Sequence, residues 1–194
     1  PPGLIRIIIK TNQISIFNIA FCREFHSDHF AKRFPEIVRL FELKHTWFDP
    51  GSSKVQSHLI NVIDDIITHY DIDAIHFDDY FYPYPNKSNA GIHELFPYSD
   101  LYQAYKKNGG KLNLPDWRRE NVNKMVKDVS NLIRTKAPMV KFGIAPFGIW
   151  RPHHPIEVEA DLDAFKHIYA DSKKWLQMGW LDYFSPQLYW AINS

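Results

Sequence analysis

The sequence predicts an α/β domain built on a parallel sheet. Three segments with helical periodicity alternate with three short apolar runs along most of the chain. Such alternation is typical of parallel strands joined by right-handed crossovers. The apolar runs are nearly continuous, as expected for strands that are buried on both faces. With 194 residues, of which 45% are hydrophobic, the chain is long enough for one domain, residues 1–194, with a sizeable core.

The first 50 residues give the weakest signals. Residues 4–21 predict two β-rich runs around a polar KTNQ turn, and residues 28–43 predict a weak helix that Pro35 interrupts. The segment HTWFDPGSS then predicts a turn-rich connection, and its last two residues, Ser52 and Ser53, are good helix caps. Residues 1–27 fit no clear α/β unit and form an atypical N-terminal segment.

The three predicted helices span residues 53–70, 116–137 and 161–178. The first two carry apolar stripes at helical spacing, with Asp116 as the expected cap of the second and Gly179 ending the third. The predicted strands are DIDAIHF, VKFGIAPFG and LDYFSPQLYW. Long loops, residues 79–115 and 146–160, follow two of these strands, and in α/β folds that is the end where sites are built.

Composition narrows the possible functions. Lys plus Arg is 23 and Asp plus Glu is 22, so the net charge is +1, which argues against a nucleic-acid partner. No apolar run reaches the ~18 residues of a membrane span. Cys22 is the one cysteine, which excludes a disulfide framework or a cysteine-built zinc site. Glycine-rich phosphate loops and a GxSxG elbow are absent, so we expect neither a nucleotide cofactor nor a serine nucleophile. The oligomeric state stays open.

All three strands end in polar and aromatic side chains. The ends read HFDDYFYPYP, APFGIWRPHH and SPQLYW, and aromatic residues make up 15% of the chain. Aromatic rings serve cores and interfaces in most proteins, but rings gathered at strand ends also suit a carbohydrate site, where they stack on sugar faces. A barrel would collect these strand ends around one pocket.

The adjacent acids Asp78 and Asp79 are the leading catalytic candidates. Alternation along a strand places His76 and Asp78 on one face, so Asp78 would point into the pocket mouth and Asp79 into the loop or toward a neighbouring strand. Close carboxylates can split their pKa values and supply an acid and a base. The alternative is a pair that only braces the loop. A metal site in which His153 or His154 joins His76 and Asp78 is a further alternative, although we predict no metal.

Four long blocks of the chain resemble the bacterial glycosyl hydrolase-like family ten. They begin at WFDPGSSKVQ, DWRRENVNKMV, FGIAPFGIWR and YADSKKWLQM, and the resemblance covers roughly residues 28–190. It implies a (β/α)8 TIM barrel that cleaves glycosidic bonds of a polysaccharide or a peptidoglycan-type glycan outside the cell or in its envelope. A barrel usually needs ~250 residues, and residues 1–27 lack a clear first strand, so we expect an incomplete barrel here.

The resemblance also assigns residues to the predicted site. The catalytic carboxylate would be Asp78 or Asp79. Independently of the resemblance, Glu94, Glu157 and Asp116 are possible partner acids within the chain. Arg118 and Arg119, at a helix start, would face a loop acid or an acidic substrate. The substrate-binding residues would be His76, Tyr80, Tyr82, Trp150, Arg151, Gln187, Tyr189 and Trp190. The rival functions are a glycan-binding protein without catalysis and a metal-dependent polysaccharide deacetylase.

Overall fold

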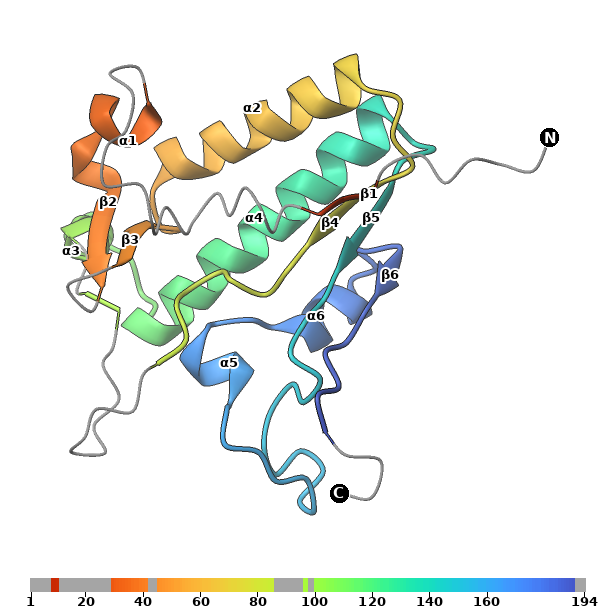
Figure 1. Cartoon of the computed structure of the whole chain (residues 1–194). Coiled ribbons are helices and arrows are strands. Elements are labelled where there is room, and N and C mark those ends of the chain that lie inside the picture. Colours follow the sequence, from red (N-terminus) through yellow and green to blue (C-terminus); the bar gives the residue numbers. More distant parts are fainter. Residues whose placement is uncertain (1–7, 11–28, 42–44, 86–95, 98–99, 191–194) are drawn as a thin grey trace.

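The computed structural model describes residues 8–10, 29–41, 45–85, 96–97 and 100–190. Within them, β1 (Ile8–Lys10), β4 (Ala74–Phe77), β5 (Lys141–Ile144) and β6 (Tyr183–Phe184) form a sheet in the order β1-β4-β5-β6. All its pairings are parallel, which confirms the predicted mixed α/β fold with a parallel sheet. A separate antiparallel pair, β2 (Val38–Phe41) and β3 (His45–Phe48), lies beyond the carboxyl end of β4 (Figure 1).

Two long helices cover one face of the sheet. Figure 1 shows α2 (Ser53–His69) and α4 (Leu114–Lys136) side by side behind the strands. Their apolar stripes are buried, with Leu59 and Ile63 on α2 and Val126 and Val129 on α4 at 1% exposure or less. The two stripes are those predicted from the sequence. No helix in the described part of the chain is long and apolar enough to cross a membrane.

The caps of these helices differ in one respect from the prediction. Ser52 takes the N-cap position of α2, although its side chain makes no capping hydrogen bond. Asn113, rather than Asp116, caps α4, because its side-chain oxygen accepts a hydrogen bond from the backbone N–H of Asp116 at 2.9 Å. Pro115 fits the first turn, where a missing N–H costs nothing. Asp116 therefore lies inside the first turn, where its charge complements the helix dipole.

The predicted third helix is in fact two short ones. Helices α5 (Ala164–His167) and α6 (Ser172–Gln177) are separated at Tyr169, whose φ of 56° is incompatible with a continuous helix. Helix α6 then begins after Asp171, whose side chain caps the helix by accepting a hydrogen bond from the backbone N–H of Lys174. A buried hydrogen bond of 2.7 Å from Trp175 Nε1 to Asn123 Oδ1 fastens α6 to α4.

The N-terminal expectations were partly wrong. Residues 28–43 contain α1 (Phe30–Arg33), the 3-10 turn η2 (Pro35–Ile37) and strand β2, and the predicted turn at residues 45–48 is strand β3. The long loop after β4 also contains a helix, α3 (Asp100–Lys107). Of the two predicted β-runs in residues 4–21, one coincides with β1, and the rest lies outside the described residues.

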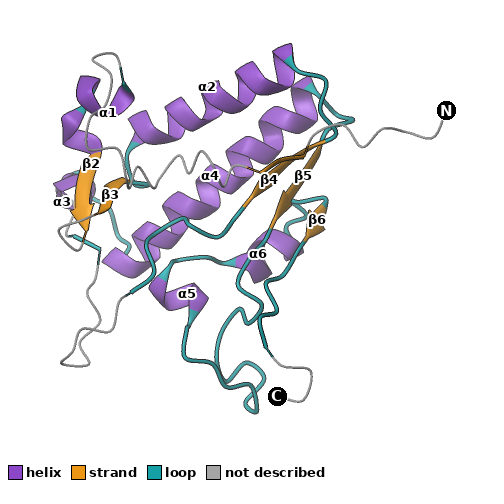
Figure 2. Cartoon of the chain, viewed as in Figure 1, coloured by secondary structure: helices purple, strands orange, loops and turns teal. Residues whose placement is uncertain are grey.

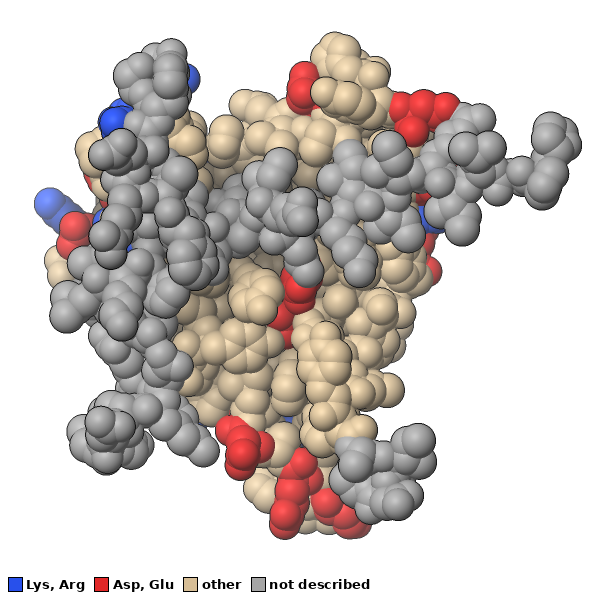
Figure 3. Space-filling view, viewed as in Figure 1, with Lys and Arg blue, Asp and Glu red and all other residues tan. Residues whose placement is uncertain are grey.

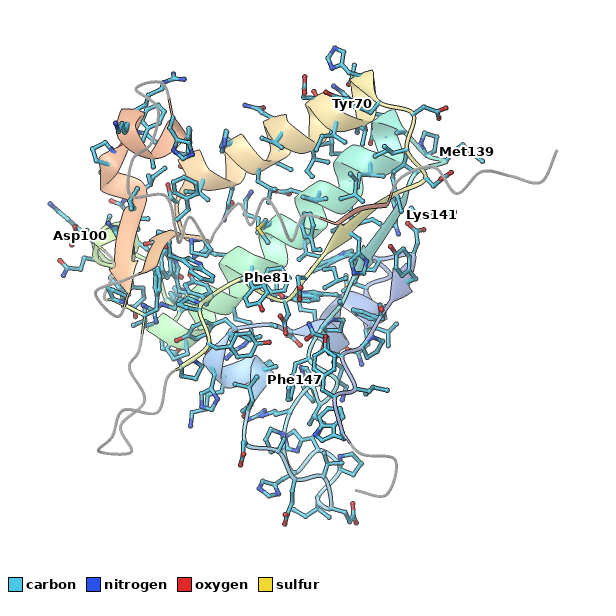
Figure 4. All side chains as sticks on the ribbon, viewed as in Figure 1. Tyr70, Phe81, Asp100, Met139, Lys141 and Phe147 are labelled. Carbon is cyan, nitrogen blue, oxygen red and sulfur yellow. The ribbon has the colours of Figure 1, made fainter. Side chains whose placement is uncertain are left out.

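The opposite face of the sheet carries no described helix over its strands, as Figures 1 and 2 show. The strands point their carboxyl ends toward the lower half of that view. Figure 4 places Lys141 and Met139 at the starting end of β5 and Phe147 beyond its far end. The predicted site therefore lies on the side of Phe147, where the chain leaves β4, β5 and β6.

Candidate active site

Asp78 is held at the carboxyl end of β4 by two hydrogen bonds. Its Oδ1 accepts from the backbone N–H of Asp79 and from the side-chain amide of Gln187, both at 2.8 Å. The residue is partly exposed. Among the described residues, Oδ2 has no hydrogen-bond donor, so the structure fixes Asp78 through Oδ1 alone.

Asp79 has the opposite environment. It is only 1% exposed, and its Oδ2 accepts a hydrogen bond from the hydroxyl of Tyr84. Burial raises the pKa of Asp79 from 3.8 to about 7, and the nearby charge of Asp78 adds to the rise, while the hydrogen bond from Tyr84 opposes it. Asp79 is thus protonated at acidic pH and loses its proton around pH 7, and the two adjacent acids divide into a partly exposed one and a buried one with a raised pKa.

A polar row crosses the sheet just below these acids. His76 on β4, Gly143 on β5 and Tyr183 on β6 are register partners on the face that carries no described helix. The Tyr183 ring passes over Gly143 and stacks on His76 with 5.6 Å between centroids, and its hydroxyl lies 3.0 Å from His76 Nδ1. A Cβ at position 143 would lie 2.1 Å from that ring, so only glycine leaves room for this contact.

Gln187 reaches Asp78 because the chain beyond β6 stays paired to the chain beyond β5. Its backbone N–H donates to the Pro146 carbonyl at 2.9 Å, and its own carbonyl accepts from Gly148 at 3.2 Å. A Cβ at position 148 would lie 2.6 Å from the Gln187 carbonyl oxygen, which explains the glycine there. The expectation that the strand ends converge thus holds for the ends of β4, β5 and β6.

The predicted sugar-binding rings fall into two groups. Tyr189 is 85% exposed, and Tyr80 and Trp190 are 44% and 43% exposed, so their faces are open to a ligand. Trp190 also packs edge-on against Phe147 at 5.7 Å. The prediction that Tyr82 binds the substrate must be corrected, because Tyr82 is 0% exposed and packs edge-on against Phe96 and Tyr169. It is a core residue below the site and offers no surface to a sugar.

Trp150 and Arg151 belong to the loop between β5 and α5. Trp150 packs edge-on against Phe165 at 5.5 Å, and Arg151 lies 4.9 Å above the same Phe165 ring and 3.7 Å from Asp163. Trp150 also lines an open hollow of about 710 Å³ with His153, His154, Pro155 and Lys173. Within the described residues, no hydrogen bond or ion pair joins Trp150 or Arg151 to the two acids.

The structure also shows the surroundings of the histidines considered for a metal site and of Arg118. His153 and His154 are exposed in the β5–α5 loop, and the described part of the chain contains no group of three or more His, Cys, Asp or Glu side chains that could hold a metal ion. Arg118 is buried and donates to the carbonyls of Phe96 and Pro97 and to Tyr169. It braces the loop that follows β4.

The proposed partner carboxylates stay unassigned by this geometry. Asp116 is engaged by Arg119 at 2.5 Å, so the loop acid expected for that arginine lies in its own helix. Glu157 is exposed in the β5–α5 loop, and Glu94 lies outside the described residues.

Sequence reasoning missed Tyr84 and Tyr183 as parts of the site. Tyr84 belongs to the same aromatic block as Asp79, and Tyr183 lies two residues into a predicted strand. One signal could have indicated Tyr183. It carries a polar ring on a short predicted strand, on the face where His76 is expected two strands away.

Most of the chain is similar to known proteins. Residues 24–194 match the protein family described as glycosyl hydrolase-like 10. The chain is 39% identical over 170 residues to the glycosyl hydrolase YngK of Bacillus subtilis (strain 168), covering 86% of this chain and 32% of that protein. It is 34% identical over 149 residues to the glycosyl hydrolase DigH of Escherichia coli (strain K12), covering 75% and 32%.

The chain therefore spans about a third of the length of the curated relatives that it matches. Among solved structures, a match to alpha-L-fucosidase isoenzyme 2 from Paenibacillus thiaminolyticus has a TM-score of 0.42 at 11% identity, and it covers 64% of this chain and 20% of that one.

Proposed function

The chain belongs to the glycosyl hydrolase-like 10 family, and from that premise we propose that it carries the acid site of a glycoside hydrolase. The substrate class we propose is a polysaccharide or a peptidoglycan-type glycan. The observation that carries the proposal is the accessible carboxylate of Asp78, fixed at the carboxyl end of a parallel sheet beside the buried Asp79. We further propose that the four parallel strands are an arc of a (β/α)8 barrel, in which such strand ends form the active site.

The proposed reaction is glycoside hydrolysis, which needs both a proton donor and a carboxylate. An acid protonates the leaving glycosidic oxygen while a carboxylate attacks the anomeric carbon or activates a water, so that water is finally added across the broken bond. Asp78 is the carboxylate that contacts the sugar. Asp79 retains its proton below about pH 7 and thereby limits the negative charge of the pair under those conditions. A partner carboxylate ~5 to 5.5 Å away would give retention, and one ~6.5 to 9.5 Å away inversion.

The exposed rings of Tyr80, Tyr189 and Trp190 supply the proposed sugar platform. Their exposure, from 43% to 85%, is high for aromatic side chains next to a polar strand end. Flat apolar ring faces match the C–H faces of a pyranose, and polar edges leave the hydroxyls for hydrogen bonds. In Figure 3 the described part of this view is mostly uncharged, with acidic side chains near the centre and at the lower edge.

The experiment that tests this function measures new reducing ends released from a panel of glycans. The panel includes peptidoglycan strands with and without their peptides. Asp78→Asn is expected to lower the release at least about 100-fold, the scale of a lost acid–base or nucleophilic group. Asp65→Asn is the matched control, because Asp65 is an exposed carboxylate near the end of α2, paired with His69. Equal release from Asp78→Asn and from the control would contradict the proposal.

A glycan-binding protein without catalysis is the second candidate. It is favoured by the burial of Asp79, which removes one of the two predicted acids from direct contact with a ligand. It predicts that the chain is retained on a glycan affinity matrix and that Tyr189→Ala weakens the retention, with no reducing ends released at any pH. We also propose, from the family alone, that the protein works in the cell envelope or outside the cell, which fractionation would test.

A further inference from the structure

The side chain of Gln187 has only one possible orientation. Its Nε2 lies 2.8 Å from Asp78 Oδ1 and 2.9 Å from the backbone carbonyl of Ala145. Both neighbours are acceptors only, so the NH2 group must face them and must use its two hydrogens there. The amide oxygen then points away from both, and among the described residues it accepts no hydrogen bond.

The backbone around Gln187 is fixed as firmly as its side chain. The bridge between Phe147 and Gln187 extends the parallel pairing of β5 and β6 beyond the strands themselves. The donor to Asp78 therefore belongs to the sheet framework, and Gln187 joins the carboxyl ends of three neighbouring strands through one amide group.

Asp78 receives a specific geometry from this arrangement. The backbone N–H of Asp79 and the amide of Gln187 both donate to Oδ1, and together they fix the plane of the carboxylate. Without Gln187, one local hydrogen bond from the adjacent residue would remain, and the carboxylate could rotate about χ2. A displacement of ~1 Å in a reacting group can lower a rate by roughly 100-fold.

We propose that Gln187 is a positioning residue for Asp78, which holds the carboxylate with Oδ2 turned toward the substrate. Sequence reasoning placed Gln187 among the residues that bind sugar hydroxyls, and its contacts assign it to the carboxylate instead. The inference rests on the proposed hydrolase function, because an oriented carboxylate matters for a reaction at that oxygen.

Two substitutions test the role. Gln187→Leu keeps a similar size and removes both donors. Gln187→Glu places a third acid beside Asp78, and its one O–H donor exists only when the new carboxyl is protonated. Gln177→Leu and Gln177→Glu are the controls, because Gln177 is an exposed glutamine at the end of α6.

The kinetic readout is glycan release as a function of pH. We expect Gln187→Leu to lower kcat roughly 10- to 100-fold with KM changed less than about threefold. Gln187→Glu should be at least as impaired at pH 8 and should recover part of the activity toward pH 5, where the donor returns. A rise in KM at unchanged kcat would overturn the proposal and restore Gln187 as a substrate-binding residue.

The second readout needs no activity. Carboxyl ¹³C NMR follows the titration of Asp79, whose pKa of about 7 is lowered in part by Gln187 and raised by Asp78. Loss of the amide should move this titration to higher pH in both Gln187 variants, further in Gln187→Glu, and in neither Gln177 control. An unchanged titration would overturn the positioning role. Absence of glycan release from the unmodified chain would overturn the proposed function alone, because the titration would still report on Gln187.

Discussion

The two faces of the central sheet are made from alternate residues of the same strands, yet they have different chemistry. Ile75, Phe142 and Ile144 face the helices and are at most 1% exposed. Their chain neighbours His76 and Gly143, together with Tyr183, the register partner of Gly143, face the other side and form a polar row. A period of two thus separates a packing surface from a chemical one within strands of four residues or fewer.

The contrast separates the residues that stabilise the fold from the residues that form the candidate site. The helix-facing residues stabilise the fold through removal of apolar area from water. The other face holds a glycine that admits a ring, and the chain just beyond β4 holds a buried acid and a partly exposed carboxylate. Substitutions on the two faces should therefore have different effects on stability and on glycan release.

The largest effect is expected on the helix-facing side. Phe142→Ala should lower the free energy of unfolding by about 3–5 kcal/mol, because it removes a fully buried ring that packs edge-on against Phe77 at 5.0 Å. Urea titration followed by circular dichroism measures the loss. Met139→Ala is the control, because Met139 precedes β5 and is 84% exposed, so its loss should stay within about 0.5 kcal/mol. A Phe142→Ala effect as small as that of the control would mean that this face is not the core.

The second effect concerns the buried acid and depends on pH. Asp79 binds its proton more tightly in the folded protein, with a pKa of about 7 against 3.8 for an ordinary solvated aspartate. The unfolded chain therefore holds fewer protons between those values, and the wild-type stability should fall as the pH rises from about 4 to about 7. At pH 8.5 the buried charge costs on the order of 4 kcal/mol, at about 1.4 kcal/mol per pKa unit.

Asp79→Asn removes that charge and keeps an oxygen for the Tyr84 hydroxyl. The variant should be more stable than the wild type at pH 8.5 and similar to it at pH 4. Thermal or urea unfolding at the two pH values measures the difference. The same change at exposed Asp65 should give no pH-dependent gain. A stability difference between Asp79→Asn and wild type that is constant across this pH range would contradict the raised pKa.

The third effect is the closure of the gap at Gly143. In Gly143→Ala the new methyl group would lie 2.1 Å from the Tyr183 ring, so the ring must leave its place on His76. We expect a loss of about 1–3 kcal/mol, typical of overpacking. In the Tyr183→Ala background the same substitution should cost much less, and this double-mutant cycle measures the coupling. Additive effects would show that the ring does not occupy the gap.

Sequence patterns predicted the helix-facing half of the molecule well. The stripes of α2 and α4 are long, so their periodicity fixed both helices to within about two residues at each end. The prediction of one third helix was wrong because the chain takes a positive φ at Tyr169, which the residue type alone does not indicate. Asp171, a good N-cap, was the available sign of a second start.

The site could be predicted only as a location. Parallel strands end at a common edge, so Asp78 and Gln187 were expected near each other despite a separation of 109 residues. Which side chain meets which depends on register, and short strands carry too little pattern to specify it. Tyr82 was misassigned for a related reason. The chain after β4 is irregular, so no period indicates which rings of YFYPY turn inward, and Tyr82 is buried while Tyr80 is exposed.

The smallest effect tests whether the polar row contributes more to chemistry than to folding. Tyr183→Phe keeps the ring over Gly143 and removes only the hydroxyl that lies 3.0 Å from His76 Nδ1. Both residues are partly exposed, so water can replace the lost partner and the free energy of unfolding should fall by about 1 kcal/mol or less. His76 lies two residues before Asp78, and an imidazole that has lost the Tyr183 hydroxyl can alter the field at that carboxylate. We therefore expect Tyr183→Phe to change the rate of glycan release clearly, while its urea midpoint stays close to that of the wild type. The reverse outcome, a clear loss of stability with normal release, would make this row a packing element like the opposite face and would confine the chemistry to the strand ends.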